Sequence, residues 1–146
     1  MLLNVNRLSR LTLAIIGITV IAGCQKSHPD IVPVSGQVTI DGQPVTHGQI
    51  TVMPEGRRPS IGKLDAEGRF SLSCFAVGDG APIGTHIVTV TAVEPLGEHA
   101  NRWHAPKKYA SKAGGVWVVI DGPTKDLNVP LSWANESERA PFVDRF

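Results

Sequence analysis

The 146-residue chain has little cysteine and almost no net charge, and each absence excludes a class of protein. Its two cysteines, Cys24 and Cys74, cannot form the disulfide framework on which very small secreted domains depend. Fourteen basic against thirteen acidic residues leave a formal charge of +1, without the basic excess typical of nucleic-acid binding. We therefore expect a domain that folds around its own core and has no nucleic-acid partner.

Motifs that identify common enzymes are also missing. The chain has no His-Glu-x-x-His zinc motif, no Gly-x-Ser-x-Gly nucleophile and no cysteine with a partner histidine. The Gly-Asp-Gly sequence at 78–80 lacks the spacing of a phosphate-binding loop. His99 and His104 lie near carboxylates and could ligate zinc or copper, but no rigid element fixes their spacing. We predict a non-enzymatic protein with no metal and no cofactor.

The most informative segment that is present is the apolar run LTLAIIGITVIAGC at 11–24. Two arginines precede it and polar residues follow, a pattern typical of a secretory signal peptide and too short to cross a bilayer as a helix. Its final VIAGC resembles the bacterial lipobox, in which the signal is cut before a cysteine that receives lipid. An ordinary cleaved signal and an uncleaved anchor are the alternatives, but the terminal Gly-Cys pair favours lipidation of Cys24.

These features predict four segments and an address. Residues 1–23 are a lipoprotein signal peptide, 24–33 a polar tether, 34–131 the folded domain and 132–146 a charged tail. Removing the signal leaves twelve basic and thirteen acidic residues, a formal charge of −1. Several acyl chains attached at Cys24 would hold the exported protein stably on the cell envelope. An aspartate directly after the lipidated cysteine would resemble an inner-membrane retention signal. This chain has Gln25 there, so we expect it to be anchored in the outer membrane.

Alternation of apolar and polar residues, rather than a helical period, runs through the domain. Val34, Val38 and Ile40 fall on one face of a predicted strand, and Asp41–Pro44 is predicted to be a hairpin turn. Pro130 cannot donate to a neighbouring strand, so the last strand is expected at a sheet edge. The predicted strands are 34–40, 45–53, 69–74, 85–93, 116–120 and 127–131. Six or seven strands with Gly/Pro turns indicate an all-β antiparallel sandwich.

The same alternation predicts which side chains form the core. Ile50 and Val52 should point inward from the second strand. Phe70, Leu72 and Cys74 share one face of the third, whereas the serine at 71 faces the other way. Cys74 is thus expected to be a small buried hydrophobe rather than a reactive thiol.

Five segments together resemble the carboxypeptidase-regulatory-like domain. They are VSGQVT at 34–39, DGQPV at 41–45, GQITV at 48–52, DAEGRF at 65–70 and GTHIVTV at 84–90. Many bacterial lipoproteins combine a lipobox with such a domain and a later Pro-Lys-Tyr segment, similar to PKKY at 106–109. The resemblance covers about residues 34–131 and implies a transthyretin/prealbumin-like sandwich. Its motifs are turn glycines and strand hydrophobes, so they say little about function.

The chain departs from this family at two positions. His86 stands where the family usually has tyrosine, and Gln49 where it usually has alanine. We expect a structural role for His86, either buried and hydrogen-bonded or at the exposed start of a strand. Transthyretin-like hydrolases of a purine-breakdown product end in Tyr-Arg-Gly-Ser, whereas this chain ends in Val-Asp-Arg-Phe, which disfavours that activity.

The connection Glu94–Gly115 is the candidate functional segment, because it is longer than most connections in compact domains. Its side chains suit stacking on sugars or contact with acidic surfaces. The candidate ligand-binding residues are Arg102, Trp103, His104, Lys107 and Tyr109. In the competing interpretation, its aromatic rings pin a long crossover onto the sandwich. In the tail, the aromatic residues at 133, 142 and 146 could dock on the sheet.

Three functions remain open. The first is a lipid-anchored, non-enzymatic module of the cell envelope, bound to the membrane through its lipid and to an envelope protein or polysaccharide. The second is a carrier that binds a sugar or peptide with the 94–115 segment. The third, which we favour least, is a metal-binding protein or hydrolase that uses His99 and His104.

Lipidation can be tested in cells. An alkyne fatty acid should label the wild-type protein and fail to label Cys24→Ser, because the thiol is the acylated atom. A disulfide between Cys24 and Cys74, found by non-reducing mass spectrometry, would instead contradict the lipoprotein interpretation.

Overall fold

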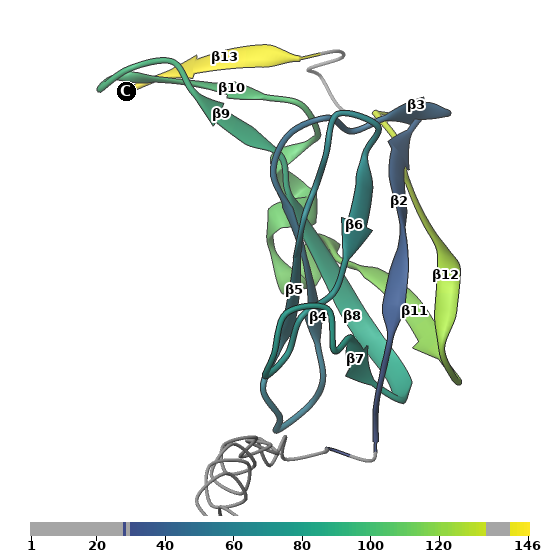
Figure 1. Cartoon of the computed structure of the whole chain (residues 1–146). Coiled ribbons are helices and arrows are strands. Elements are labelled where there is room, and N and C mark those ends of the chain that lie inside the picture. The colour runs from purple at the N-terminus through teal and green to yellow at the C-terminus, as the bar shows by residue number, and fades with distance from the viewer. Residues whose placement is uncertain (1–27, 29, 134–140) are drawn as a thin grey trace, which may run out of the picture.

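Two four-stranded β-sheets face each other across a hydrophobic core in the computed structural model, which describes residues 28, 30–133 and 141–146 (Figure 1). The first sheet has the strand order β11-β8-β4-β5, and all its pairs are antiparallel. Its strands are β4 (Gln49–Met53), β5 (Ser60–Lys63), β8 (Gly84–Thr91) and β11 (Val116–Ile120). β5 has no counterpart among the predicted strands.

The second sheet is built around its central strand, which pairs with the three others. Its strands are β2 (Val34–Ile40), β3 (Gln43–Pro44), β6 (Arg69–Ser71) and β12 (Thr124–Leu131), with β2 the central one. A short antiparallel pair, β1 (Ile31–Val32) with β7 (Ala81–Pro82), lies where the described chain begins. The predicted all-β sandwich is confirmed.

One strand pair departs from the predicted antiparallel pattern. β12 runs parallel to β2, with Leu127 opposite Gly36 and a register shift between Thr124 and Leu127. The close approach requires glycine: a Cβ on Gly36 would lie 1.9 Å from the Leu127 carbonyl oxygen. β12 lies at the edge of its sheet, as Pro130 predicts.

A hairpin turn is present where the sequence predicts one, but it takes up only Asp41 and Gly42 of the predicted Asp41–Pro44, and the strand after it also differs from the prediction. Asp41 and Gly42 have φ of 47° and 82°, and they close a two-residue turn between β2 and β3. The chain then leaves this sheet, and β4 begins only at Gln49, in the other sheet. The predicted strand 45–53 is therefore wrong over 45–48, which cross between the sheets. Gly48 (φ 113°) allows the crossing, because a Cβ there would lie 2.1 Å from the Thr91 carbonyl oxygen.

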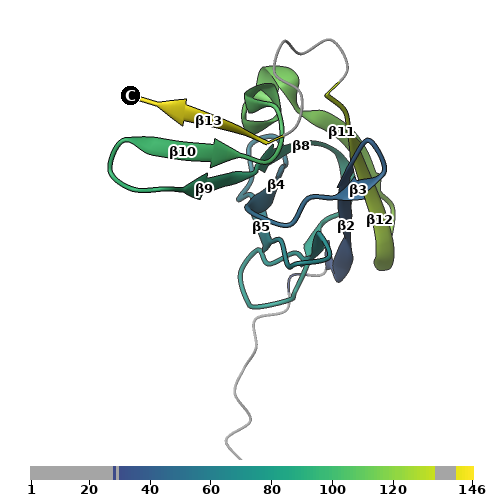
Figure 2. The same cartoon turned by 90° about the horizontal axis from the view of Figure 1, so that it is seen from above.

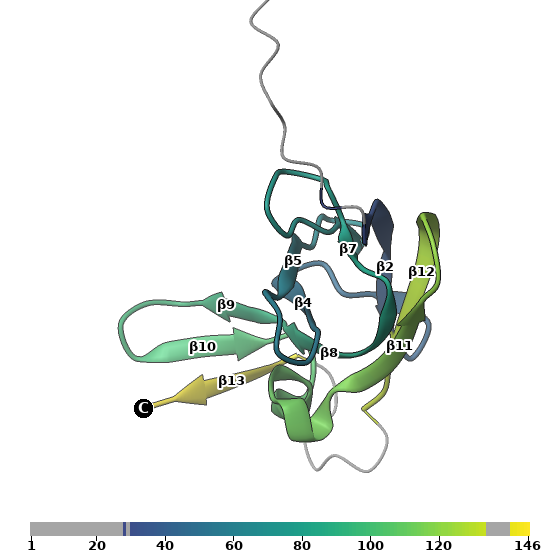
Figure 3. The same ribbon diagram turned by 90° about the horizontal axis from the view of Figure 1, so that it is seen from below.

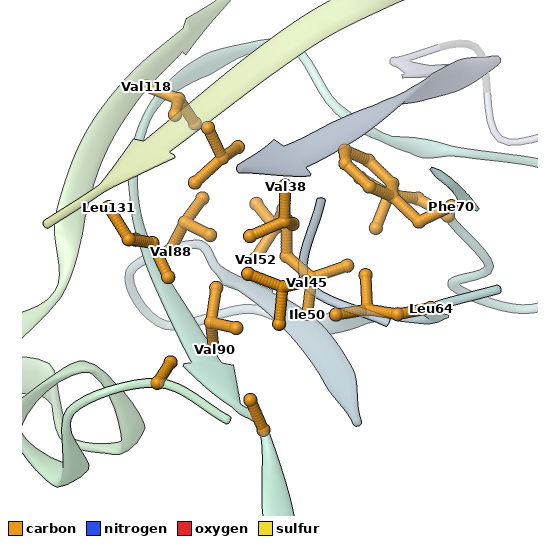
Figure 4. Close-up of a cluster of buried hydrophobic side chains, with 14 of the residues drawn as sticks. Val38, Val45, Ile50, Val52, Leu64, Phe70, Val88, Val90, Val118 and Leu131 are labelled. Carbon is orange, nitrogen blue, oxygen red and sulfur yellow. The ribbon is translucent and has the colours of Figure 1, made fainter. Parts of the chain in front are cut away.

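The core contains the side chains that the alternation places inside. Ile50 and Val52 are fully buried, and Phe70, Leu72 and Cys74 are buried on one face. Figure 4 shows Val38 of the second sheet close to Val52 and Val88 of the first. His86 is also buried, with its Nε2 2.9 Å from the Pro82 carbonyl oxygen, which decides between the two placements left open for it.

The segment 94–115 is an ordered structure, which corrects the prediction of a long loop. It contains β9 (Val93–Pro95, which begins one residue earlier), β10 (Ala100–Trp103) and the 3₁₀ turns η2 (Lys107–Ala110) and η3 (Lys112–Gly114). The C-terminal strand β13 (Phe142–Arg145) pairs with β10 and completes a third sheet. Figures 2 and 3 show this sheet, hereafter the projecting sheet, standing off the sandwich.

Part of the predicted tail after β12 is therefore folded against the rest of the domain. Trp133 is buried in the core and makes an edge-to-face contact with Phe142, with the ring centroids 6.4 Å apart. Phe146, in contrast, is largely exposed. The predicted signal peptide, and residues 24–27 and 29 of the predicted tether, lie outside the described residues, whereas Ile31–Val32 of the tether form β1. Within the described ranges, no helix has the length and apolar character needed to cross a bilayer.

Truncating one core side chain tests the assignment of the faces. Phe70→Ala should lower the free energy of unfolding by about 3–5 kcal/mol, because it leaves a cavity in the core. Ser71→Ala, on the exposed face of β6, should change it by about 0.5 kcal/mol or less. Chemical denaturation measures both, and equal losses would contradict the alternation.

Candidate functional site

The projecting sheet has two faces with different chemistry, set by the register of its strands. Trp103 pairs with Phe142 on one side and Val93 on the other, so these three share a face. Arg102 pairs with Val143 and Glu94, which therefore lie on the opposite face. Alternation along β10 thus separates two of the predicted ligand-binding residues that are adjacent in sequence.

The first face, hereafter the tryptophan face, combines two aromatic rings with an ion pair. Lys107 Nζ lies 5.4 Å from the centroid of the Trp103 ring and 5.7 Å from that of Phe142. The same ammonium donates a hydrogen bond of 2.5 Å to Asp144 Oδ2. The Trp103 ring is half-buried, and among the described residues no acceptor reaches its buried indole N–H. An aromatic surface, a cation and a carboxylate are therefore within reach of one ligand.

The opposite face, hereafter the histidine face, carries a carboxylate that bridges two basic groups. Glu94 Oε2 accepts from Arg102 Nη1 and lies 3.1 Å from both this atom and His104 Nε2. The His104 ring stacks on His47, with the centroids 4.6 Å apart. His47 comes from the crossing segment between β3 and β4, so the stack joins the projecting sheet to the sandwich. The hydrogen bond from His104, and then that from Arg102, holds the pKa of Glu94 below its ordinary value.

Tyr109 belongs to neither face. It lies in η2 and packs half-buried against the core. Its hydroxyl donates to the Ser132 carbonyl oxygen at 3.2 Å and accepts from the Ser132 N–H at 3.1 Å. This is the pinning contact of the competing interpretation, and it places Tyr109 in the support of the site rather than on its surface.

A groove of about 380 Å³ adjoins the histidine face at the base of the projecting sheet. Its lining is mainly apolar, with His104, Asp41 and Thr46 among the polar residues. The other lining residues are Ile40, Gln43, Pro44, Val45, Trp133 and Pro141. A larger hollow of about 460 Å³, near Pro33 and Pro123, lies away from both faces. The smaller groove is the better candidate for a small ligand, because it joins apolar walls to an ionisable group.

The structure does not bring together the histidines considered as metal ligands. His99 and His104 lie at opposite ends of β10, about 17 Å apart along an extended strand. The stacked rings of His47 and His104 are 16° from parallel, so their ring-nitrogen lone pairs do not converge on one ion. The described ranges contain no group of three His, Cys, Asp or Glu residues that could hold a metal ion.

Several residues of the site could not be recognised from sequence. Phe142 and Asp144 come from the predicted tail, and His47 from a predicted strand. Their partners are 37 to 57 residues away in the chain, and no local pattern indicates such pairings. The placement of Arg102 and Trp103 on opposite faces could have been predicted. It follows from the two-residue period of a strand, once the segment is recognised as a strand.

The histidine face predicts a pH-dependent contribution to stability. Because folding lowers the pKa of Glu94, its charged form stabilises the protein above the ordinary glutamate pKa, and this is lost as pH falls through the lowered value. Glu94→Gln should therefore lower the melting temperature at pH 7, and by progressively less as the pH falls below the ordinary glutamate pKa. Glu98→Gln, on the exposed β9–β10 connection, is the matched control. Equal effects of the two variants at pH 7, or an undiminished effect of Glu94→Gln at pH 3, would contradict the role of the cluster.

Comparisons of the chain with protein-family models, with curated proteins and with solved structures found no match. Function must therefore be argued from the residues and their geometry. The two faces of the projecting sheet and the groove beside them provide that geometry.

Proposed function

We propose that the chain is an exported, lipid-anchored β-sandwich of the bacterial cell envelope, with a non-enzymatic binding role carried by its projecting sheet. The VIAGC sequence at 20–24 and the resemblance of residues 34–131 to a carboxypeptidase-regulatory-like domain support the anchor and the transthyretin-like family. The projecting sheet supports the binding role, because it stands off the sandwich (Figures 1–3) and touches the main core through Phe142.

The arrangement of the two ends supports a division of labour. The described chain begins at one end of the sandwich, beside β1 and β7, and the projecting sheet lies at the other end (Figure 1). A lipid on Cys24 would hold the first end at the membrane and leave the projecting sheet directed into the envelope space. Binding residues at the far end from an anchor are accessible to partners that do not share its membrane.

The tryptophan face suits an envelope polysaccharide. Sugar rings present apolar C–H faces surrounded by hydroxyls, so a site for them needs an aromatic surface with donors and acceptors at its rim. Trp103 and Phe142 offer that surface, Lys107 offers donors and Asp144 offers an acceptor. An envelope protein with a complementary ion pair is the other partner class for this face.

A small-ligand carrier is the second candidate, and the groove beside His104 is the observation that favours it. About 380 Å³ is enough for a small sugar or a short peptide fragment. Binding in the groove would involve the histidine face, so Glu94→Gln should weaken it and Lys107→Ala should not. Binding on the tryptophan face should show the reverse.

Lys107→Ala tests the polysaccharide site. Lys107 is exposed, and an exposed ion pair contributes about 0–1 kcal/mol, so the melting temperature should change little. Co-sedimentation with purified peptidoglycan sacculi should fall at least about tenfold, as expected when one charge-assisted contact is lost. Lys112→Ala, in the adjacent turn η3, is the matched control and should bind like the wild type. Equal binding by both variants would contradict the assignment of the tryptophan face.

Trp103→Ala separates recognition from packing. If the half-buried ring is a ligand surface, the variant should lose sacculus binding while its melting temperature stays close to that of the wild type. If the ring is a packing anchor, truncation should lower the free energy of unfolding by about 3–5 kcal/mol. Because the ring is only half-buried, we expect the loss of binding to dominate. A thermal melt showing the full packing loss would overturn recognition at this residue.

A further inference from the structure

We propose that the end of the sandwich opposite the projecting sheet docks on the bilayer surface that carries the lipid anchor, through the exposed side chains of Phe75, Val77 and Ile83. These three residues are hereafter the apolar tip. The inference rests on the proposed anchor at Cys24 and adds a second membrane contact to it.

The three side chains of the apolar tip expose a large part of their hydrophobic surface to solvent. Val77 is fully exposed, and Phe75 and Ile83 retain 49% and 47% of their accessible surface. Single exposed apolar residues are common, but a cluster of large ones at one end of a domain marks an interaction site. The three come from the 74–80 connection and from the residue after β7, at the end where the described chain begins.

The connection that displays Phe75 and Val77 is held in shape by one carboxylate. Asp79 accepts hydrogen bonds from the N–H groups of Cys74, Phe75 and Ala76, at 2.7, 2.9 and 2.9 Å. The Gly78 N–H donates to Ser73 Oγ at 2.9 Å. The loop therefore presents its apolar side chains outward with its backbone groups already satisfied, which lowers the entropy lost on docking.

The start of the described chain runs through this patch. The His28 ring stacks on Phe75 with the centroids 3.8 Å apart, and the Ile83 N–H donates to the Asp30 carbonyl oxygen at 3.0 Å. Cys24 precedes His28 by four residues, which span at most about 14 Å when extended. A lipid on Cys24 would therefore keep the apolar tip beside the bilayer surface. At the high effective concentration that this tether provides, three side chains suffice for a contact that would be weak between separate molecules.

The charges around the patch make the contact apolar rather than electrostatic. Arg57 forms an ion pair with Asp30, and the guanidinium of Arg58 lies 5.5 Å from the centroid of the Phe75 ring. The carboxylate of Asp79, which holds the 74–80 connection, adds a further negative charge. Arg58 can keep its head among lipid headgroups while the Phe75 ring enters below it. We therefore expect docking on zwitterionic and anionic lipids alike, with little dependence on salt.

Depth-dependent quenching tests this contact on the lipid-bearing mature protein. The environment-sensitive fluorophore NBD is attached at Val77→Cys, and the protein is reconstituted in phosphatidylcholine vesicles with doxyl-labelled lipids. Unsubstituted protein is the labelling blank, because its Cys74 is buried. The matched control carries the label at Val143→Cys, an exposed position of the projecting sheet. We expect quenching at 77 at least about threefold stronger than at 143, since only the apolar tip enters the headgroup region.

Further arms separate this inference from the anchor and from other occupants. Phe75→Ser with Ile83→Ser should reduce quenching at 77 towards the value at 143, whereas 0.5 M salt or added phosphatidylglycerol should not. Intact-mass measurement reports the lipid on Cys24. Lipid present with equal quenching at 77 and 143 overturns docking alone, and lipid absent overturns both the anchor and the docking. Self-quenching of the label that rises with the protein-to-lipid ratio would identify a second copy of the chain as the occupant and would likewise overturn docking on lipid.

Discussion

One polar junction at the end of the sandwich holds the segments that carry β10 and β13 of the projecting sheet. Asp41, in the turn between β2 and β3, accepts hydrogen bonds from Ser132 Oγ at 2.7 Å and from the Trp133 N–H at 3.2 Å. The backbone of Ser132 in turn binds the Tyr109 hydroxyl through both its N–H and its carbonyl oxygen. The junction therefore ties the turn after β2, the end of β12 and η2 together.

Two supports of the projecting sheet pass through this junction, beside the direct continuation of β8 into β9. η2 follows β10 closely, so fixing Tyr109 fixes the chain that leaves the sheet. Trp133 is buried beside the junction and contacts Phe142 of β13, the strand that completes the sheet. An isolated two-stranded hairpin is marginal in water, so β9 and β10 need this third strand and these contacts to hold their shape. The chemistry of the tryptophan face thus depends on contacts made within the sandwich.

Sequence alternation predicted the parts of the fold whose burial is decided locally. The faces of β2, β4 and β6 follow from the two-residue period, and the Asp41-Gly42 turn follows from the need for positive φ at both positions. Local pattern is reliable in these three strands because one face of each is buried against the same core and the other carries polar residues. In β11, in contrast, all five residues are apolar, and only the structure shows that Trp117 and Val119 are exposed.

The features that sequence did not predict depend on partners far along the chain. The parallel pairing of β12 is visible only through the close approach to Gly36, which the sequence presents as an ordinary strand glycine. β13 is short and half polar, and only its pairing with β10 makes it a strand. The candidate site residues were expected in one segment, but their division between two faces and their contacts with His47 and Asp144 required the structure.

The two proposed contacts lie at opposite ends of the sandwich (Figure 1), and this has a geometric consequence. β2 runs the length of the sandwich, and its seven residues span about 23 Å. With a tether of a few residues and the apolar tip on the lipid, the orientation of β2 relative to the bilayer is restricted. The projecting sheet is then held at a nearly constant height rather than moving freely on a long linker. A partner of the tryptophan face must therefore lie in the layer of the envelope at about that distance from the membrane, which fits an extended polysaccharide better than a freely diffusing small ligand.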